Sequence, residues 1–393
     1  MNLDASWGTI AGALGEAEGR ALTIGPGRWH VLFDGRQRPL LMPAGDYRMQ
    51  KRCLRYFVGN RMHALCAHAL LKANALAPAA GLLREVRLPS AHRVLPRCEL
   101  PQREPSHAAI QIGTEGPYQK ASLLLTSADG DPLALAKMAL VPSADHMVTI
   151  EGEWLKKLED VSRLDGHVPK LLAEGSGLNG RRYLVTTLAP STAVSRAFTP
   201  EHAMFLAALG RARLDSTSFD KSTCLQYLEQ TLAHIERYVP AESIAELRAA
   251  LDDCRKSLAG WVGPFVIAQG DFASWNIRVH EKGIFVFDWE YARTGANSLA
   301  DVLHYLSIER ALSALGLGVR MFSNIMRRTA GLAGQLYPEW SWRPRVVSGL
   351  ALAYLLEVLL HYTWASRHLD GQHPVIKSYW HLMQTRPHWM VAP

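Results

Sequence analysis

The 393-residue sequence predicts an α+β protein, in which a β-rich part with one helix precedes a mainly helical part. Residues 108–190 hold short apolar runs separated by Gly, Asp and Asn, whereas most of residues 191–393 has apolar residues at helical spacing. Hydrophobic residues make up 48% and charged residues 20%, which is typical of a globular chain. The length allows two or three domains.

The first 107 residues are expected to form a basic N-terminal extension of unknown role. Residues 20–45 resemble two short strands, residues 47–76 have helical spacing, and the Pro-rich segment 88–107 is expected to be a linker. The net charge of +7 falls entirely within residues 1–110, which hold 15 Lys and Arg and 8 Asp and Glu. This excess indicates either a solvated surface or a peripheral contact with an anionic surface. No feature indicates specific nucleic-acid recognition.

The next segment predicts a sheet with one inserted helix. Two apolar runs within residues 108–140 are joined by "ADGDP", and Asp-Gly between such runs favours a hairpin. Lys137 lies inside the second run, where an ammonium group without a partner is costly to bury. A helix is expected in "MVTIEGEWLKKLEDV", and residues 168–190 indicate two more strands around a Gly/Asn turn.

From residue 191 the pattern is mainly helical, with short strands expected at "FVIAQ" and "GIFVFDW". Residues 346–365 are apolar enough to span a bilayer, but Glu357 and His361 favour a buried helix of a soluble domain, so no transmembrane segment is expected. The N-terminus lacks the basic and apolar pattern of a signal peptide.

The cysteines indicate free thiols. Their number is odd, they are scattered, and no CxxC occurs, which argues against a disulfide framework or a zinc site. We therefore expect a reducing compartment, the cytoplasm. The five are Cys53, Cys66, Cys98, Cys224 and Cys254.

A group of polar residues stands out in "AQGDFASWNIRVHEKGIFVFDWE", residues 268–290. Asp271, Asn276 and Asp288 lie in apolar surroundings, and pairing of the flanking strands would collect them at one end of a small ribbon. Asn276 and Asp288 offer the oxygen ligands that Mg²⁺ prefers. Asp271 would then be left to accept a proton from an attacking hydroxyl, or to orient it.

"QGDFASWN" followed by "FDWE" resembles the catalytic and metal loops of the aminoglycoside phosphotransferase/choline kinase family, a branch of the protein-kinase-like fold. The family pattern is H-G-D-x-x-x-x-N, then D-x-E or D-W-E; Gly295 and Asp301 match its next element. The resemblance covers about residues 108–390. It implies a bilobal fold with a sheet-bearing N-lobe and hinge at 108–190 and a helical C-lobe at 191–393, preceded by the extension 1–107.

The resemblance also implies roles for single residues. Asp271 would be catalytic, while Asn276 and Asp288 would hold Mg²⁺. Lys137 would contact the ATP phosphates, oriented by a helix glutamate for which the helical register favours Glu151 over Glu153.

The remaining roles concern the nucleotide. "IGTEGP", with Gly113 and Gly116, is either the turn that covers the nucleotide or an ordinary turn. ATP would lie between the lobes, its adenine against the backbone near Thr187 and Leu188.

The expected function is an ATP- and Mg²⁺-dependent phosphotransferase acting on a hydroxyl of a small molecule or glycan. A sugar-like acceptor is favoured over an aminoglycoside, because residues 111–393 are charge-balanced rather than acidic. Gln269 replaces the family's histidine; Gln also donates and accepts hydrogen bonds, so it can support the loop. The alternative is a catalytically degenerate nucleotide-binding regulatory or scaffold module. The absence of A-P-E argues against a protein kinase.

Overall fold

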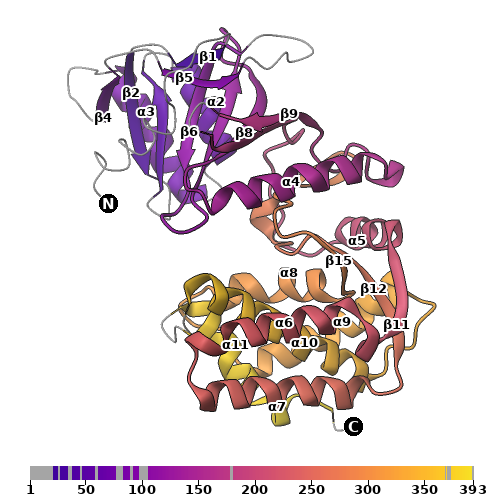
Figure 1. Cartoon of the computed structure of the whole chain (residues 1–393). Helices are drawn as coiled ribbons and strands as arrows, with labels where there is room; N and C mark the ends of the chain where they lie inside the picture. The colour runs from indigo at the N-terminus through magenta and orange to yellow at the C-terminus, as the bar shows by residue number, and fades with distance from the viewer. Residues whose placement is uncertain are drawn as a thin grey trace. The chain divides into compact units, whose positions relative to one another are not determined.

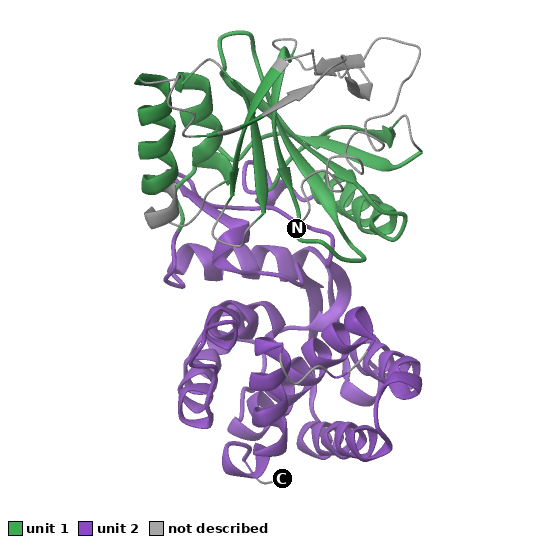
Figure 2. Cartoon of the chain, turned by 90° about the vertical axis from the view of Figure 1, so that its left-hand side faces the viewer, with its two compact units in different colours: residues 1–160, 168–194 green, residues 161–167, 195–393 purple. Residues whose placement is uncertain are grey.

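The protein was analysed as a computed structural model, and it divides into two compact units (Figure 2). Unit 1 contains residues 1–160 and 168–194, and unit 2 contains residues 161–167 and 195–393. The structure describes residues 21–24, 27–33, 38–44, 47–57, 61–76, 83–88, 92–96, 105–177, 180–367, 369 and 373–391. Unit 1 holds an antiparallel sheet and unit 2 is mainly helical, which confirms the predicted α+β class (Figure 1).

Unit 1 is built on an eight-stranded antiparallel sheet with the order β4-β2-β3-β6-β7-β8-β10-β9. Its strands are β2 Gly27–Phe33, β3 Pro39–Pro43, β4 Arg84–Leu88, β6 His107–Ile112, β7 Lys120–Thr126, β8 Pro132–Ala139, β9 Leu171–Ser176 and β10 Arg182–Thr186. Apolar side chains on both faces are buried in two core clusters, so the strands appear in the sequence as nearly continuous apolar runs.

Both predicted hairpins are present. β7 and β8 pair on either side of the turn 127–131, where Gly130 has a φ of +75°, a left-handed conformation that favours glycine. β9 pairs with β10. The predicted helix is α4 Ala144–Glu159, which follows β8 and buries Val148, Trp154 and Leu155.

The N-terminal strands continue the same sheet. β3 pairs with β6 through Leu40 and Leu41, across the boundary predicted at residue 107. The predicted helical segment forms two helices, α2 Tyr47–Phe57 and α3 Arg61–Leu76, and α2 buries Met49, Cys53 and Leu54.

Part of the predicted linker is a strand. β5 His92–Pro96 pairs with β1 Ala21–Ile24 in a separate ribbon, although its composition favoured a loop. Pairing with a distant segment supplies the backbone hydrogen bonds, and Pro96 is tolerated because it lies at the strand end. Much of the remaining linker lies outside the described residues.

Unit 2 contains seven helices in the part of the chain that is described, and all of them except α5 contribute to one apolar core cluster. The seven helices are α5 Pro200–Ala212, α6 Thr223–Ile235, α7 Ala241–Leu258, α8 Ala300–Ala311, α9 Val319–Leu336, α10 Pro344–Ser366 and α11 Pro374–Gln384. Two small sheets accompany them: β11 Leu214–Ser218, β12 Val262–Ala268 and β15 Arg293–Asn297 form one, and β13 Ile277–His280 and β14 Gly283–Val286 form the other.

α10 lies at the centre of this core. Within the described residues it is the one helix long and apolar enough to cross a membrane, and 83% of its apolar window is buried inside the protein. It contacts α6, α7, α8, α9 and α11. Its Glu357 pairs with Arg293 of β15, with 3.2 Å between Arg293 Nε and Glu357 Oε1. The structure therefore agrees with a buried core helix.

Four of the five cysteines fall in the described residues, and none of these four forms a disulfide. Cys53, Cys224 and Cys254 are buried and Cys66 is exposed. Cys98 lies outside the described residues.

Candidate functional site

Lys137 and Glu151 form a buried ion pair in unit 1. Lys137 lies in β8, opposite Ser122 of β7 and Leu184 of β10, and its Nζ lies 2.7 and 2.8 Å from the two carboxylate oxygens of Glu151. Glu151 is only 2% exposed, whereas Glu153 is exposed. Burying either charge alone would be costly, so each group depends on the other. The structure thus brings together the two residues that the sequence analysis paired.

Gly113 and Gly116 lie in the turn between β6 and β7. The Gly113 N–H donates to the Lys120 carbonyl at 2.8 Å, and a Cβ added to Gly113 would also lie 2.8 Å from that oxygen. This contact is too close for any side chain, which explains the glycine. Gly116 accepts a hydrogen bond from the Gln119 N–H at 3.2 Å. The two glycines therefore close a tight hairpin turn.

Thr187 and Leu188 follow β10. The Thr187 N–H donates to the Lys170 carbonyl at 3.0 Å, and Thr187 Oγ1 accepts from the Lys170 N–H at 2.9 Å. Leu188 packs against a buried cluster that includes Met49 and Leu54 of α2. The Thr187 N–H is therefore used within unit 1, and an adenine would have to meet other backbone groups here.

Asp271 lies in the loop after β12 in unit 2. The preceding Gly270 has a φ of +87°, and a Cβ there would lie 2.4 Å from the Tyr291 carbonyl oxygen, so the loop requires glycine. Asp271 Oδ1 lies 2.9 Å from His304 Nε2, and Oδ2 lies 2.8 Å from Asn276 Nδ2. Each carboxylate oxygen is therefore held by a neighbouring side chain.

Asn276 has its amide oriented by Asp271. Its Nδ2 donates to the backbone carbonyl of Asp271 at 3.0 Å and to Oδ2 at 2.8 Å. Because both partners are acceptors, the NH₂ end must point toward Asp271 and the amide oxygen Oδ1 away from it. The amide oxygen is the end that a hard cation would use as a ligand.

The predicted ribbon is only partly correct. β13 pairs with β14 through Ile277 and Val286, so Asn276 and Asp288 flank the same end of one ribbon. β12 pairs instead with β11 and β15, so the strand that precedes Asp271 belongs to a different sheet. The loop after β12, with the 3₁₀ turn Ser274–Asn276, carries the chain from one sheet to the other.

Asp288 has a strained backbone and an acidic neighbour. Its φ is +68°, and in the described chain the only other non-glycine residue with positive φ is Arg367. A short polar side chain tolerates this conformation better than most others. A carboxylate oxygen of Asp288 lies within 4.8 Å of one of Glu290, which is 6% exposed. Two carboxylates this close favour a shared cation.

Gln269 ties the two loops together. Its Nε2 donates to the Asp288 carbonyl at 2.5 Å and to the Phe287 carbonyl at 3.2 Å, and its Oε1 accepts from the Asp271 N–H at 2.9 Å. Gln269 is fully buried. Its amide thus has the loop-supporting position that the sequence analysis assigned to the family's histidine.

Asp301 holds the backbone of the Asp271 loop from α8. Its Oδ2 accepts from the Gln269 N–H at 2.8 Å and its Oδ1 from the Gly270 N–H at 3.0 Å. Burial raises the pKa of Asp301 to about 6, because the loss of hydration outweighs these two donors and the nearby His304.

This raised pKa predicts a pH-dependent stability difference between wild-type protein and Asp301→Asn. The ordinary pKa is 3.8, so between that value and about 6 the folded protein binds a proton that the unfolded chain releases. The contribution of Asp301 to the unfolding free energy should therefore rise as the pH falls from 7 to 5, by about 1 kcal/mol. Asn cannot titrate. The difference in unfolding free energy between the two proteins, measured by urea unfolding at pH 7 and pH 5, therefore isolates the contribution of Asp301. A pH-independent difference would contradict the prediction.

His304 is a residue that the sequence analysis missed. It lies on α8, three residues after Asp301, and is 7% exposed. The available signal is the i, i+3 spacing of Asp301 and His304, which places both polar side chains on one face of the helix. That spacing does not predict which residue His304 contacts.

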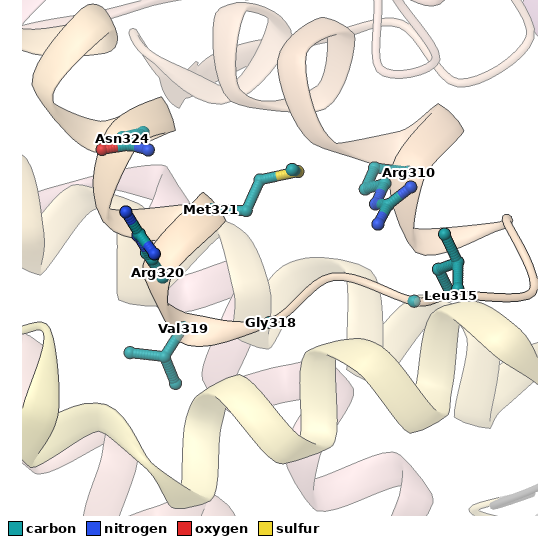
Figure 3. A pocket seen from close by; sticks show the side chains of 8 residues that line it. Arg310, Leu315, Gly318, Val319, Arg320, Met321 and Asn324 are labelled. Atoms are coloured by element: carbon teal, nitrogen blue, oxygen red, sulfur yellow. The ribbon is translucent and has the colours of Figure 1, made fainter.

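A pocket of about 510 Å³ lies where α8 ends and α9 begins (Figure 3). Arg310 and Arg320 give it positive charge, and Leu315 and Met321 are exposed beside them. The next residue back along α8, Glu309, accepts a hydrogen bond from Ser274 of the Asp271 loop. The complete lining is Arg310, Leu315, Gly316, Gly318, Val319, Arg320, Met321 and Asn324.

Two solved structures show what this chain is similar to. One is a thermostable mutant of the aminoglycoside phosphotransferase APH(4)-Ia, in its apo form, at 16% identity and a TM-score of 0.48, over 70% of this chain and 94% of that one. Another is choline kinase from Cryptosporidium parvum Iowa II, at 11% identity and a TM-score of 0.49, over 71% of this chain and 89% of that one. No curated protein matches.

Residues 138–329 match the model of the family described as "Phosphotransferase enzyme family". The matched segment contains α4 with Glu151, the Asp271 loop, Asp288 and α8. This match places the likeness to the family in residues 138–329, just under half of the 393-residue chain.

Proposed function

We propose that the protein is an ATP- and Mg²⁺-dependent phosphotransferase that transfers the γ-phosphate to a hydroxyl of a small molecule or glycan. The observation that carries this proposal is the arrangement in unit 2. There three side chains, Asn276, His304 and Trp275, hold the Asp271 carboxylate, and the amide oxygen of Asn276 points away from it. The paired carboxylates of Asp288 and Glu290 add a second set of oxygen ligands.

Asp271 is proposed to orient the acceptor hydroxyl and accept its proton. Its Oδ2 accepts from Asn276 and, at 3.4 Å, from Trp275, whereas Oδ1 accepts from His304. A carboxylate oxygen has two lone pairs, so Oδ1 can accept a second hydrogen bond, from a hydroxyl. Asp271 is thus able to bind a hydroxyl while its side chain stays fixed. Holding the nucleophile in line is the main task of a protein in phosphoryl transfer.

Asn276 and Asp288 are proposed to hold Mg²⁺, with Glu290 close to Asp288. The donor set fits the ion, because carboxylate and amide oxygens are its preferred protein ligands. When bound, the ion would neutralise charge on the phosphates.

The proposed nucleotide contacts belong to unit 1. Lys137, held by Glu151, would contact the ATP phosphates. The turn with Gly113 and Gly116 would cover the nucleotide, and the backbone near Thr187 and Leu188 would border the adenine.

The acceptor is proposed to be sugar-like rather than an aminoglycoside. Arg310 and Arg320 line the pocket beside α8, and a polycationic ligand would be repelled there. We propose that these two arginines favour an acceptor with hydroxyl groups and a negative charge.

The extension, residues 1–107, is proposed to contact an anionic surface in the cytoplasm. α2 contains no acidic residue, and its Arg48, Arg52 and Arg55 are exposed, with Arg52 paired to Asp131. Co-sedimentation with phosphatidylserine vesicles tests this contact, and binding that does not weaken with added salt would argue against it.

The function is tested by measuring ADP release from Mg·ATP in the presence of a panel of hydroxyl-bearing metabolites, including sugars and glycan intermediates. We expect acceptor-dependent ADP release by the wild-type protein. Calorimetry that shows Mg·ATP binding without any phosphate transfer or hydrolysis would instead support a degenerate regulatory or scaffold module.

Lys137→Met should lower kcat/KM for ATP by about 10²-fold or more, because one charge contact to the phosphates is lost. Glu151 would be left buried without its partner, which costs about 3 kcal/mol of stability. The double variant Lys137→Met with Glu151→Leu should recover the thermal stability but not the activity. Lys156→Ala is the matched control, since Lys156 is an exposed lysine paired with Glu174. Recovered activity in the double variant would reject the assignment of Lys137.

A further inference from the structure

We propose that His304 is a positioning residue for Asp271, fixed in one tautomer by a buried chain of hydroxyl groups. The role of His304 in catalysis rests on the proposed function, whereas its hydrogen bonds do not depend on that function. His304 Nε2 lies 2.9 Å from Asp271 Oδ1, and Nδ1 lies 3.1 Å from the Tyr354 hydroxyl.

The contact with Asp271 selects the tautomer. An ionised carboxylate only accepts hydrogen bonds, so His304 Nε2 must carry a proton. In the neutral ring Nδ1 is then an acceptor, and the Tyr354 hydroxyl must donate to it. The tautomer of His304 is therefore determined from both sides of the ring.

The chain continues through two further hydroxyls. The Tyr354 oxygen lies 2.9 Å from the Tyr379 oxygen and 3.2 Å from Ser307 Oγ, and Tyr379 lies 2.7 Å from Ser307. Ser307 donates to the Leu303 carbonyl at 2.6 Å, which ends the chain on the backbone of α8.

One assignment of donors and acceptors satisfies every hydroxyl group in this hydrogen-bond network. Ser307 donates to Leu303, Tyr354 donates to His304, and Tyr379 donates to Ser307 or Tyr354. Every hydroxyl proton has an acceptor, which matters because an unpaired buried polar group costs about 1–3 kcal/mol. A chain satisfied in this way holds the imidazole firmly.

Burial and packing keep the ring in place. Tyr354, Tyr379 and Ser307 are 2%, 0% and 0% exposed, and they come from α10, α11 and α8. These three helices all contribute to the same apolar core cluster of unit 2. The orientation of the Asp271 carboxylate is thereby connected to three helices of the core.

α8 therefore supports the Asp271 loop at two points. Asp301 binds the backbone N–H groups of Gln269 and Gly270, and His304 binds the Asp271 side chain one helical turn later. A carboxylate held in this way before the acceptor arrives needs no reorganisation during the reaction.

The test compares His304→Ala, His304→Gln and Tyr354→Phe with wild-type protein, by ADP release from Mg·ATP with water as the acceptor. His304→Ala should lower kcat about 10–100-fold with KM for Mg·ATP within about twofold, because nucleotide contacts are unchanged. His304→Gln should recover kcat to within about fivefold, since its amide N–H reaches the place of Nε2. Tyr354→Phe should lower kcat about 3–10-fold. His388→Ala, at an exposed histidine, is the control.

An unchanged kcat in His304→Ala would overturn the proposal. So would equal losses of kcat in the Ala and Gln variants, accompanied by equal losses of thermal stability, because they would indicate a purely structural role.

A second readout does not depend on turnover. Long-range ¹H–¹⁵N spectra of the imidazoles, with His304 assigned by its absence in His304→Gln, should show a proton on Nε2. An Nδ1–H tautomer would overturn the proposal. If wild-type protein shows no turnover with any acceptor, the proposed function fails, but the spectrum still decides the hydrogen bonding of His304.

Discussion

Replacing Asp271 with asparagine should abolish phosphoryl transfer, lowering kcat by about 10³-fold or more, while Mg·ATP binding stays within a few-fold of wild type. The asparagine amide is a poor base and accepts at one oxygen only. The substitution is nearly isosteric. Its oxygen can still accept from Asn276, and His304 can turn its Nε2 into an acceptor by changing tautomer, so the fold should persist.

The measurements for Asp271→Asn are single-turnover phosphate transfer and calorimetric binding of Mg·ATP. Asp215→Asn, at an exposed aspartate in β11, is the matched control and should retain wild-type rates. Transfer at more than one tenth of the wild-type rate in Asp271→Asn would reject Asp271 as the group that receives the proton.

Replacing Asp288 with asparagine should also lower activity strongly at ordinary Mg²⁺ concentrations, through weaker binding of the metal. One negative charge is lost at the ligand set, so the Mg²⁺ concentration needed for half-maximal ADP release should rise by about 100-fold or more. Asparagine tolerates the left-handed backbone at this position, so thermal stability should stay close to that of wild type.

A titration of ADP release against Mg²⁺ at fixed ATP checks this prediction. Glu290→Gln provides the comparison and should shift the titration less, because Asn276 and Asp288 would remain as ligands. An unchanged Mg²⁺ requirement in Asp288→Asn would show that the ion is held elsewhere.

Local signals were enough to predict much of the fold. The Asp-Gly turn predicted the β7–β8 hairpin, and helical spacing predicted α4 with Glu151 on its buried side. The pairing of β12 with β11 and β15, and of β5 with β1, was not predictable. These pairings join segments far apart in the chain, and short strands carry too little pattern to select a partner.

The residues of the candidate site were likewise predictable where the signal is local in the sequence, and not where it depends on distant segments. Asp271, Asn276 and Asp288 lie within 18 residues of each other, so one sequence motif identified all three. His304 is 33 residues from Asp271, and its contact exists only because α8 packs beside the loop. For Gln269, the sequence predicted the loop-supporting role, but only the structure shows its three hydrogen-bond partners on the two loops.

The left-handed backbone of Asp288 has a consequence for protein engineering. Glycine adopts this conformation without strain, so Asp288→Gly should relieve a local cost of about 1 kcal/mol while removing a proposed magnesium ligand. Because glycine also loses more conformational entropy on folding, a selection for heat resistance alone would tolerate glycine at residue 288, although such variants would lack the proposed magnesium ligand. Libraries meant to yield robust, working variants of this protein should keep that codon fixed.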